Sequence, residues 1–301
     1  MVAPVRPARL PLVLSTAALA IAIAAPLKAE EGDYSFWQTL VNLVSPPKAD
    51  NKVTAAQRTG SYPLLSNPSG FSDGFQPGRY DAWQTIQLAP STGAVCGDGS
   101  PFKFFVNRVA DTRNTIVYME GGGACWDYAS CTGQTGVRGA RNPNGIPDDY
   151  MSLLNPGASL VSPFVTRVSP FDAVKTQGWN MVYIPYCTGD IYSGDRVAVY
   201  DDPSGQNAPL VWHHNGVRNV RAVVSWLKDN LPRPTQMLST GCSAGGAGSL
   251  TSYHPLRRDL APTRSFLIDD SGPIFPTPKN GNPVDYPSQP LMALIRSAWG
   301  L

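Results

Sequence analysis

Continuous apolar runs of strand length mark the middle of this chain. Residues 114–120 (NTIVYME) and 179–187 (WNMVYIPYC) hold few polar positions and many β-branched or aromatic ones. Such runs predict strands that are buried on both faces. Residues 82–88 (AWQTIQL) alternate apolar and polar positions, which predicts a half-buried strand, and residues 102–109 (FKFFVNRV) predict another. The turn-like ADTR that follows predicts a hairpin between 102–109 and 114–120.

Helical spacing appears in the second half of the chain. Five apolar residues recur at helical intervals through 216–231, so we expect a helix there. Residues 235–240 predict a strand, followed by a helix that Pro255 ends. A strand at 264–272 and a helix at 289–300 complete the expected order. Alternating strands and helices indicate an α/β fold, with a mostly parallel, doubly wound sheet covered by helices on both faces.

The first 29 residues differ from the rest. Arg6 and Arg9 lie in a start that has no acidic residue, an apolar run follows, and small Ala29 precedes two glutamates. This order predicts a signal peptide over residues 1–29. A retained membrane anchor is the alternative, but the run is shorter than the roughly 20 residues that span a bilayer, and Pro11 interrupts it. We therefore expect a secreted or periplasmic protein with no membrane contact after cleavage.

Composition divides the remainder into an extension and a domain. Residues 30–80 are rich in Pro, Gly and Ser, apart from a candidate amphipathic helix at 33–44. We expect one α/β domain over residues 81–301. The 301-residue chain is 42% hydrophobic and 15% charged, and that charged share is below the roughly 25% usual for soluble domains. With 28 Gly and 29 Pro, the chain is predicted to be globular and rich in structured loops.

The charge balance argues against a polyanionic partner. The whole chain has a formal net charge of +2, and without Arg6, Arg9 and Lys28 it has 21 basic and 22 acidic residues. That remainder contains no basic cluster and no basic stripe with interleaved aromatic residues. We therefore expect no nucleic-acid binding.

Export would place the five cysteines in an oxidising compartment, where disulfides persist. Cys125 and Cys131 are six residues apart, a spacing that can close a small loop. Cys96 and Cys187 are then candidates for a second pair, which leaves Cys242 free, but the sequence leaves the connectivity open. The alternative is a zinc site, yet CxxC pairs and histidines at metal-ligand spacing are absent. We expect no metal and no cofactor.

A serine lies between glycines where the predicted strand at 235–240 gives way to a helix. Gly241-Cys242-Ser243-Ala244-Gly245 fits G-x-S-x-G, the pattern of a nucleophile elbow. The sharp turn exposes the serine hydroxyl, and the glycines permit the strand and helix to approach closely. The amide of Ala244 then points toward an oxyanion at the positive end of the helix. The alternative is that small residues serve only helix–sheet packing.

A second glycine motif follows another predicted strand. The stretch MEGGGACWD, residues 119–127, resembles the glycine-rich oxyanion loop that follows a buried strand in lipases and esterases. The amides of Gly122 and Gly123 are candidates to complete an oxyanion hole, and Trp126 is a candidate pocket residue. A plain glycine turn is the alternative. The two motifs together, in this order, favour the catalytic interpretation.

These motifs carry a family resemblance. In sequence order, EGGGACWDYASC, NMVYIPYCTGDIYSGD, GCSAGGAGSL and DDSGPIF resemble the pectinacetylesterase/Notum family of serine carboxylesterases, and CGDGSPFKFFV around Cys96 fits as well. The resemblance extends over roughly residues 80–275. It implies an α/β-hydrolase fold and a Ser-Asp-His triad that hydrolyses esters. Plant members of the family remove acetyl groups from pectin, and animal members remove a fatty acyl group from a signalling protein.

The resemblance also implies roles for particular residues. Ser243 is the implied nucleophile, and Cys125 is the implied disulfide partner of Cys131. The implied oxyanion hole consists of the amides of Gly122, Gly123 and Ala244. In this family the triad Asp and His lie well after the serine, whereas only 58 residues follow Ser243 here. We therefore expect a C-terminally truncated chain.

The histidines of the chain offer no obvious base for Ser243. His254 lies eleven residues further on, about 16 Å along a continuous helix at roughly 1.5 Å per residue, which is too far. His213 and His214 precede the nucleophile and are interpreted as cap and surface residues at a helix start. Asp270, like its neighbour Asp269, ends a strand near the site, and we interpret it as structural or substrate-facing.

Two functions of different classes follow. The first is an exported serine carboxylesterase that removes O-acyl groups, acetyl above all, from a small-molecule or polysaccharide ester such as pectin. The second is a binding protein, or inactive fragment, that keeps the hydrolase shape without a base, because an unactivated serine hydroxyl is a poor nucleophile. A trypsin-like protease is excluded, because that fold is built from strands alone and the helix–strand alternation here contradicts it.

Overall fold

The computed structural model describes residues 49, 66–135, 139–152, 155, 162–167, 174–278 and 280–301. The expected signal peptide at 1–29 and the candidate helix at 33–44 lie outside the described residues, as does most of the expected extension at 30–80. Within the described part of the chain, no helix combines the length and the apolar character needed to cross a membrane.

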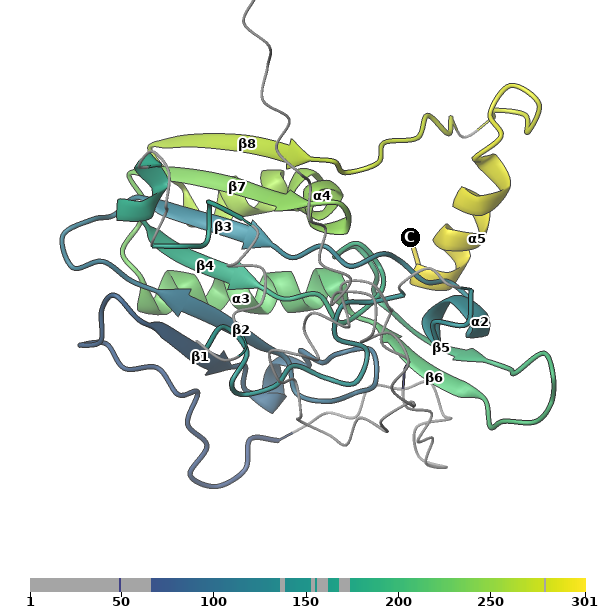
Figure 1. Cartoon of the computed structure of the whole chain (residues 1–301), viewed down its shortest axis with the longest axis horizontal. Helices are drawn as coiled ribbons and strands as arrows, with labels where there is room; N and C mark the ends of the chain where they lie inside the picture. Colours follow the sequence, from purple (N-terminus) through teal and green to yellow (C-terminus); the bar gives the residue numbers. More distant parts are fainter. Residues whose placement is uncertain are drawn as a thin grey trace, which may run out of the picture. The chain divides into compact units, whose positions relative to one another are not determined.

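Six strands form the central sheet (Figure 1). In spatial order they are β1 (Trp83–Gln87), β2 (Lys103–Asn107), β4 (Asn180–Ile184), β3 (Thr115–Met119), β7 (Gln236–Cys242) and β8 (Arg264–Asp270). β2 pairs antiparallel with β1 and β4, and the pairings from β4 to β8 are parallel. The predicted α/β fold with a mostly parallel sheet is confirmed.

The expected hairpin between residues 102–109 and 114–120 is wrong. β4 lies between β2 and β3, so β2 pairs with β1 and β4, while β3 pairs with β4 and β7. Burial explains this order, because all five positions of β3 are buried. A strand buried on both faces belongs in the middle of a parallel sheet and not at the end of a hairpin.

Two long helices pack beside each other, α3 (Gly216–Asn230) and α4 (Ala244–Leu260). The expected end of the second helix at Pro255 is wrong, since α4 continues through the proline to Leu260. A proline inside a helix costs about 3 kcal/mol. Leu256 and Leu260 are buried in the main core cluster, and each contributes about 1.5–3 kcal/mol by burial. Packing of the last helical turn thus outweighs the local penalty.

Smaller elements surround the end of the sheet where the parallel strands terminate. They are the helix α2 (Tyr128–Cys131), the antiparallel pair β5 (Arg196–Tyr200) and β6 (Leu210–His214), and α5 (Gln289–Trp299). Two 3₁₀ turns, Pro90–Thr92 and Lys175–Gly178, complete the described helices. α5 agrees with the helix expected at 289–300, whereas the hydrophobic pattern does not predict α2, β5 or β6.

The interpretation of His213 and His214 as surface and cap residues is wrong. Both lie in β6, whose five residues are all buried, and His214 is 0% exposed. Nδ1 of His214 lies 3.1 Å from the Thr188 carbonyl oxygen, so it carries a proton and donates. Nε2 then accepts from the Tyr200 hydroxyl at 2.8 Å. Burial lowers the pKa of His214 to about 3 and that of His213 to about 4, so both rings are neutral.

Two disulfides join residues that lie outside the strands. Cys96 is bonded to Cys187 across 91 residues of sequence, and Cys125 is bonded to Cys131 across six. Cys242 is free and exposed. The sequence left the pairing open, and the structure selects the arrangement with Cys242 unpaired.

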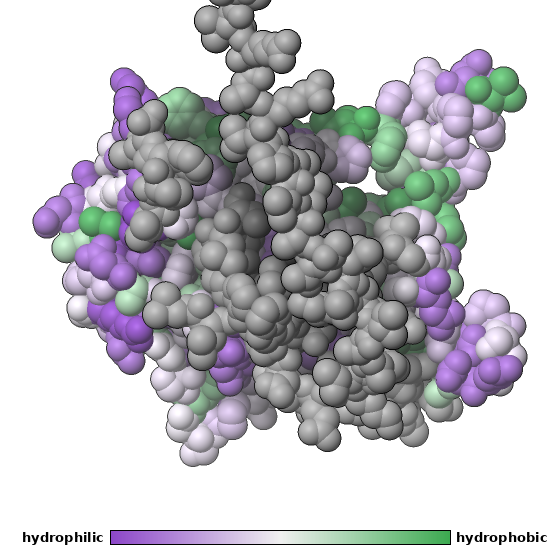
Figure 2. All heavy atoms as spheres, viewed as in Figure 1, coloured by the Kyte–Doolittle hydropathy of each residue, from purple (hydrophilic) through white to green (hydrophobic). Residues whose placement is uncertain are grey.

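Apolar side chains are least covered in the C-terminal part of the described chain. β8 alternates exposed and half-buried residues instead of being fully buried. Phe266 and Ile268 of β8 are 48% and 43% exposed, and Ile274 and Phe275 follow at 70% and 54%. Figure 2 shows hydrophobic surface along the segment that runs from the end of β8 toward α5. The serine motif on β7 therefore lies beside the least covered strand of the sheet.

The serine motif is held by unusually close backbone packing against the end of β3. Met119 of β3 is in register with Gly241 of β7. A Cβ added to Gly241 would lie 2.3 Å from the Met119 carbonyl oxygen, and one added to Gly245 would lie 2.0 Å from the same atom. Real Cβ atoms do not approach an oxygen this closely, so both positions require glycine. The small residues therefore let β7, α4 and β3 meet at one point.

This packing predicts the effect of a single methyl group. We expect Gly245→Ala to lower the free energy of unfolding by about 3 kcal/mol, because the β3 backbone must shift to admit the Cβ. Urea denaturation measures the change. Gly178→Ala is the matched control: its added Cβ meets nothing within 4 Å, so the stability should stay within about 1 kcal/mol of the wild type. Equal effects of the two substitutions would contradict this account of the packing.

The buried neutral His214 predicts a loss of stability in acid. Its pKa is about 3 in the folded chain and about 6.5 in the unfolded chain. The unfolded chain therefore binds a proton that the folded chain does not. The contribution of His214 to the free energy of unfolding is complete above pH 6.5 and declines as the pH falls toward 3. From pH 7 to pH 5 the decline is about 2 kcal/mol. Buried Asp190 acts in the opposite direction, because burial raises its pKa to about 6.

A variant comparison isolates the histidine from Asp190. His214→Gln keeps an acceptor and a donor, and we expect its drop in unfolding free energy between pH 7 and pH 5 to be about 2 kcal/mol smaller than that of the wild type. Urea midpoints at the two pH values give this difference. His254→Gln is the control, because that side chain is exposed on α4. A His214→Gln profile parallel to the wild type would show that the imidazole is not neutral in the fold.

Candidate active site

Ser243 forms the turn between β7 and α4. Its backbone has φ 57° and ψ −120°, a strained combination for a residue with a side chain. Neighbouring backbone holds the turn: the Ser243 amide donates to the Asp270 carbonyl at 2.8 Å, and the Ser243 carbonyl accepts from the Ala247 amide at 3.1 Å. Ser243 is exposed although Gly241 and Ala244 beside it are buried. The fold therefore leaves this serine exposed at the point where β7 ends.

The glycine loop after β3 touches this turn. A Cβ on Gly121 would lie 2.3 Å from the Cys242 carbonyl oxygen and 3.4 Å from Cβ of Ser243. Gly123 has φ 87°, which a glycine adopts without strain. Among the described residues, no acceptor is hydrogen-bonded to the amide nitrogen of Gly122 or Gly123. The structure thus brings together the two motifs that are 120 residues apart in the sequence.

The first turn of α4 adds amides to the same place. Ala244 directly follows Ser243 and begins the helix. The amides of a first helical turn have no acceptor within the helix, and they carry the positive end of its dipole. A negative charge that forms next to Ser243 therefore meets amides from two separate elements.

Asp270 supports the turn through its backbone. Its side chain is exposed and accepts a hydrogen bond from the Ser271 hydroxyl at 3.0 Å. Burial, and then the charge of Asp270, raise the pKa of the neighbouring Cys242 thiol. Asp269 turns instead toward the chain after β8, where its carboxylate accepts from the Gly272 amide at 2.8 Å. The described contacts of both acids are thus with the elbow and with the chain that follows β8.

Trp126 packs against α5. It is partly buried beside the cluster of Ile295, Ala298 and Trp299. Its amide donates to the Ser130 hydroxyl at 3.0 Å, which fixes the start of α2. These contacts attach Trp126 to α2 and α5, and its role as a pocket residue stays a prediction.

None of the three histidines in the sequence is hydrogen-bonded to Ser243, and all three are described. His254 lies in the third turn of α4. His214 uses both ring nitrogens for Tyr200 and Thr188, and His213 lies beside it in β6. Among the described residues, the site therefore joins an exposed serine to backbone amides, and no histidine is hydrogen-bonded to that serine.

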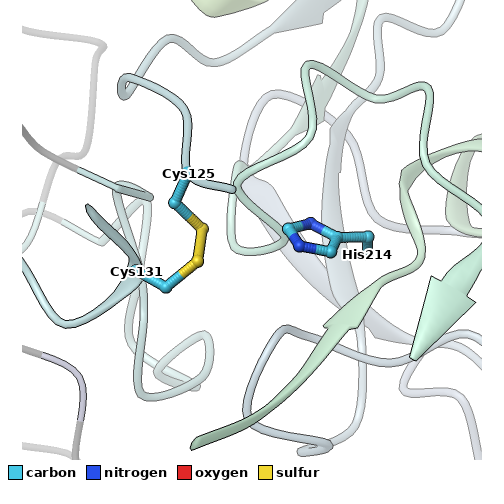
Figure 3. Close-up of side chains that lie close together, drawn as sticks. All are labelled: Cys125, Cys131 and His214. Carbon is cyan, nitrogen blue, oxygen red and sulfur yellow. A yellow bond between two sulfur atoms is a disulfide. The ribbon is translucent and has the colours of Figure 1, made fainter. Parts of the chain in front are cut away.

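Cys125, Cys131 and His214 lie within 4.8 Å of one another, and the imidazole faces the disulfide (Figure 3). The grouping resembles a metal site, but the two sulfurs are bonded to each other. Thiolates are the form of cysteine that binds metals, and both nitrogens of His214 already have partners. This cluster therefore has no free ligand atom for a metal.

Glu120, which directly precedes the glycine loop, did not emerge as a site residue from the sequence. It is only 3% exposed. Its carboxylate accepts from the Tyr186 amide and from the Asn142 side chain, each at 3.0 Å, and from the Tyr150 hydroxyl. The signal in the sequence is an acidic residue at the end of a fully buried strand, since an ionised carboxylate is almost never buried without partners.

Comparisons with known proteins agree with this geometry. The sequence model of the pectinacetylesterase family matches residues 78–280. Pectin acetylesterase 7 of Arabidopsis thaliana is 29% identical over 191 residues, which cover 62% of this chain and 44% of that protein. The palmitoleoyl-protein carboxylesterase NOTUM of Drosophila melanogaster is 26% identical over 233 residues, covering 75% of this chain and 31% of that protein. The chain spans less than half the length of both relatives.

A solved structure shares the fold. The Wnt deacylase Notum from Drosophila, solved at 1.9 Å, superposes with a TM-score of 0.50 and 23% identity, over 73% of this chain and 61% of that one. The fold expectation, an α/β-hydrolase-like sheet, is confirmed by this likeness and by the mostly parallel strand order. Because the family model covers residues 78–280, which include both glycine motifs, the chain belongs to the pectinacetylesterase family of carboxylic ester hydrolases.

Proposed function

We propose that this chain carries the nucleophile and the oxyanion hole of a serine carboxylesterase that hydrolyses O-acyl esters. One observation carries the proposal: a strained, exposed serine lies against a glycine loop whose amides have no described acceptor. Backbone donors fixed in place stabilise charge that develops in the transition state, and they need no rearrangement when it forms. Membership of a family of ester hydrolases supports the same chemistry.

The reaction would proceed through an acyl-enzyme. Oγ of Ser243 attacks the acyl carbonyl carbon, and its proton passes to a general base. The carbonyl oxygen becomes an oxyanion that accepts hydrogen bonds from the amides of Gly122, Gly123 and Ala244. Collapse of this intermediate breaks the ester bond, and the alcohol leaves with a proton. Water then attacks the acyl-serine and releases the acid and the free hydroxyl.

We propose that the substrate is an O-acetyl ester on a carbohydrate such as pectin. The family model and the name of the plant relative support this choice. The Drosophila relative is named for palmitoleoyl-protein, so a long acyl chain on a protein is the competing substrate. We also propose that the protein is exported, because two disulfides require an oxidising compartment and residues 1–29 have a signal-peptide pattern.

A binding protein without turnover is the second candidate function. The observation that favours it is the lack of a hydrogen bond between Ser243 and any of the three histidines. Loss of the base alone costs on the order of 10⁶ in rate in subtilisin. A chain with these backbone donors and no base would bind an ester and leave it intact.

Chemical rescue separates the two functions in the 301-residue chain itself. We expect slow hydrolysis of p-nitrophenyl acetate that imidazole accelerates about tenfold above its own reaction with the ester, because a free base replaces part of the 10²–10⁴ supplied by a positioned one. Release of p-nitrophenolate measures the rate. Ser243→Ala should abolish the acceleration. Cys242→Ser should retain it, and this control is needed because the exposed thiol beside Ser243 can also be acylated.

The outcomes of this experiment are distinct. An equal imidazole effect in the wild type and in Ser243→Ala would reject Ser243 as the nucleophile. Saturable ester binding without any Ser243-dependent turnover would favour the binding protein.

Acyl length tests the proposed substrate in the same assay. We expect imidazole-dependent turnover of the p-nitrophenyl acetate to exceed that of the dodecanoate by at least about tenfold, since a pocket shaped for acetyl excludes a longer chain. Rates are compared below the solubility limit of the longer ester. Faster turnover of the dodecanoate would favour a fatty-acyl substrate like the one named for the Drosophila relative.

A further inference from the structure

The Glu120 carboxylate is the most fully bonded buried acid beside the glycine loop. Oε2 accepts from the Tyr186 amide and from Nδ2 of Asn142, each at 3.0 Å. Oε1 accepts from the Tyr150 hydroxyl and lies 3.7 Å from Nε of Arg141. Four donors thus surround one carboxylate that is almost entirely removed from water.

The backbone of Glu120 is fixed as well. Its amide donates to the Ile184 carbonyl at 3.0 Å, which extends the pairing of β3 with β4 by one residue. Its carbonyl accepts from the Tyr192 hydroxyl at 2.7 Å. That carbonyl belongs to the peptide bond that leads into Gly121. The direction in which the chain enters the glycine loop is therefore set by hydrogen bonds on both sides of Glu120.

The donors to Glu120 also form the wall behind the loop. A Cβ on Gly122 would lie 2.7 Å from both the amide nitrogen and Cβ of Arg141, and 2.9 Å from the Tyr186 ring. The Asn142 amide is itself bonded to the Tyr186 carbonyl at 3.0 Å. Gly121 packs on its other side against Cys242 and Ser243. The loop is therefore enclosed between the serine turn and a wall that one carboxylate holds together.

We propose that Glu120 is a positioning residue for the oxyanion hole: its carboxylate holds the Arg141–Asn142 and Tyr186 backbone against the glycine loop, and this fixes the direction of the Gly122 and Gly123 amides. The catalytic consequence rests on the proposed function, whereas the positioning itself does not. Glu120 touches no reacting atom. It acts through the backbone that it anchors, so it is not a catalytic residue.

The ionic character of the network suits this role. Burial, with the neighbouring Glu120 charge, raises the pKa of Tyr150, so its hydroxyl keeps its proton and donates. Burial alone would lower the pKa of Arg141, but Tyr150 and Glu120 together raise it above the usual value, so the guanidinium stays charged. The charged guanidinium of Arg141 therefore lies beside a carboxylate that also accepts from the Tyr150 hydroxyl. Hydrogen bonds to a charged group are roughly twice as strong as neutral ones.

Two variants weaken the network to different degrees. Tyr150→Phe removes one donor and preserves the ring packing. Glu120→Gln replaces one acceptor oxygen with an NH₂ group that faces donors. Asn219→Ala is the matched control: Asn219 is 1% exposed and bonds the Val95 amide and carbonyl at 3.0 and 2.8 Å, in a network that contacts neither the loop nor the serine turn. It destabilises the fold without touching the wall.

The primary readout is independent of catalysis. In ¹⁵N-glycine-labelled full-length chain we expect the Gly122 and Gly123 amides to exchange at least about tenfold faster in Tyr150→Phe than in the wild type, with shifted resonances, because the loop opens locally. Glu120→Gln should show the larger effect. Asn219→Ala should leave both resonances in place. Unchanged Gly122 and Gly123 resonances in both network variants, or equal changes in Asn219→Ala, would overturn the proposal.

The second readout tests the catalytic consequence. In the imidazole-rescued assay we expect Glu120→Gln to lower kcat about 10²-fold, as loss of an oxyanion-hole donor does, with KM within about threefold of the wild type. Lower kcat in Asn219→Ala of the same size would assign the loss to general destabilisation and overturn the catalytic consequence. If the wild type shows no Ser243-dependent turnover, the proposed function fails, and the amide exchange still decides the positioning.

Discussion

The contact on which the site depends is between two pieces of backbone. The Met119 carbonyl at the end of β3 occupies the space that a Cβ would need at both Gly241 and Gly245. The parallel register aligns Met119 with Gly241, so the last residue of β3 meets the turn at the end of β7. Only a chain without side chains at both positions can close this gap. The strained geometry of Ser243 is tolerated because backbone hydrogen bonds to Asp270 and Ala247 hold the turn.

That contact also explains why the proposed oxyanion donors are backbone groups. The chain leaves β3 through Glu120 and the three glycines, and it does so directly against the Ser243 turn. Side-chain donors would need space that the close approach removes. Backbone amides need no space for a side chain, and their direction follows from the path of the chain. The carboxylate of Glu120 and the hydroxyl of Tyr192 in turn fix this path. A buried polar network therefore sets the direction of the amides in the glycine loop.

The pattern of apolar and small residues correctly predicted the elements that depend on residues close together in the sequence. The buried strands, the helix at 216–231, the serine turn and the glycine loop are where the sequence places them, because each follows from side-chain size and spacing. The position of β4 between β2 and β3 was missed, because strand neighbours depend on which strands must be buried on both faces. Pro255 and the two histidines of β6 were misassigned, since tertiary packing there outweighs propensity. Glu120 was missed because its partners, residues 141, 142, 150 and 186, are distant in the sequence.

The proposed site has two parts. Backbone packing forms the exposed serine and the amide donors, and a side chain must supply the general base. The exposed hydroxyl and the amide donors follow from backbone packing, and they persist whether or not a base is present. The oxyanion hole and binding alone account for a residual 10³–10⁴ over water in subtilisin, while the base and its partners supply the rest. The three histidines lie in α4 and β6, and none of them is hydrogen-bonded to Ser243. In the proposed function, the oxyanion hole therefore depends on the backbone packing, whereas turnover depends in addition on a base.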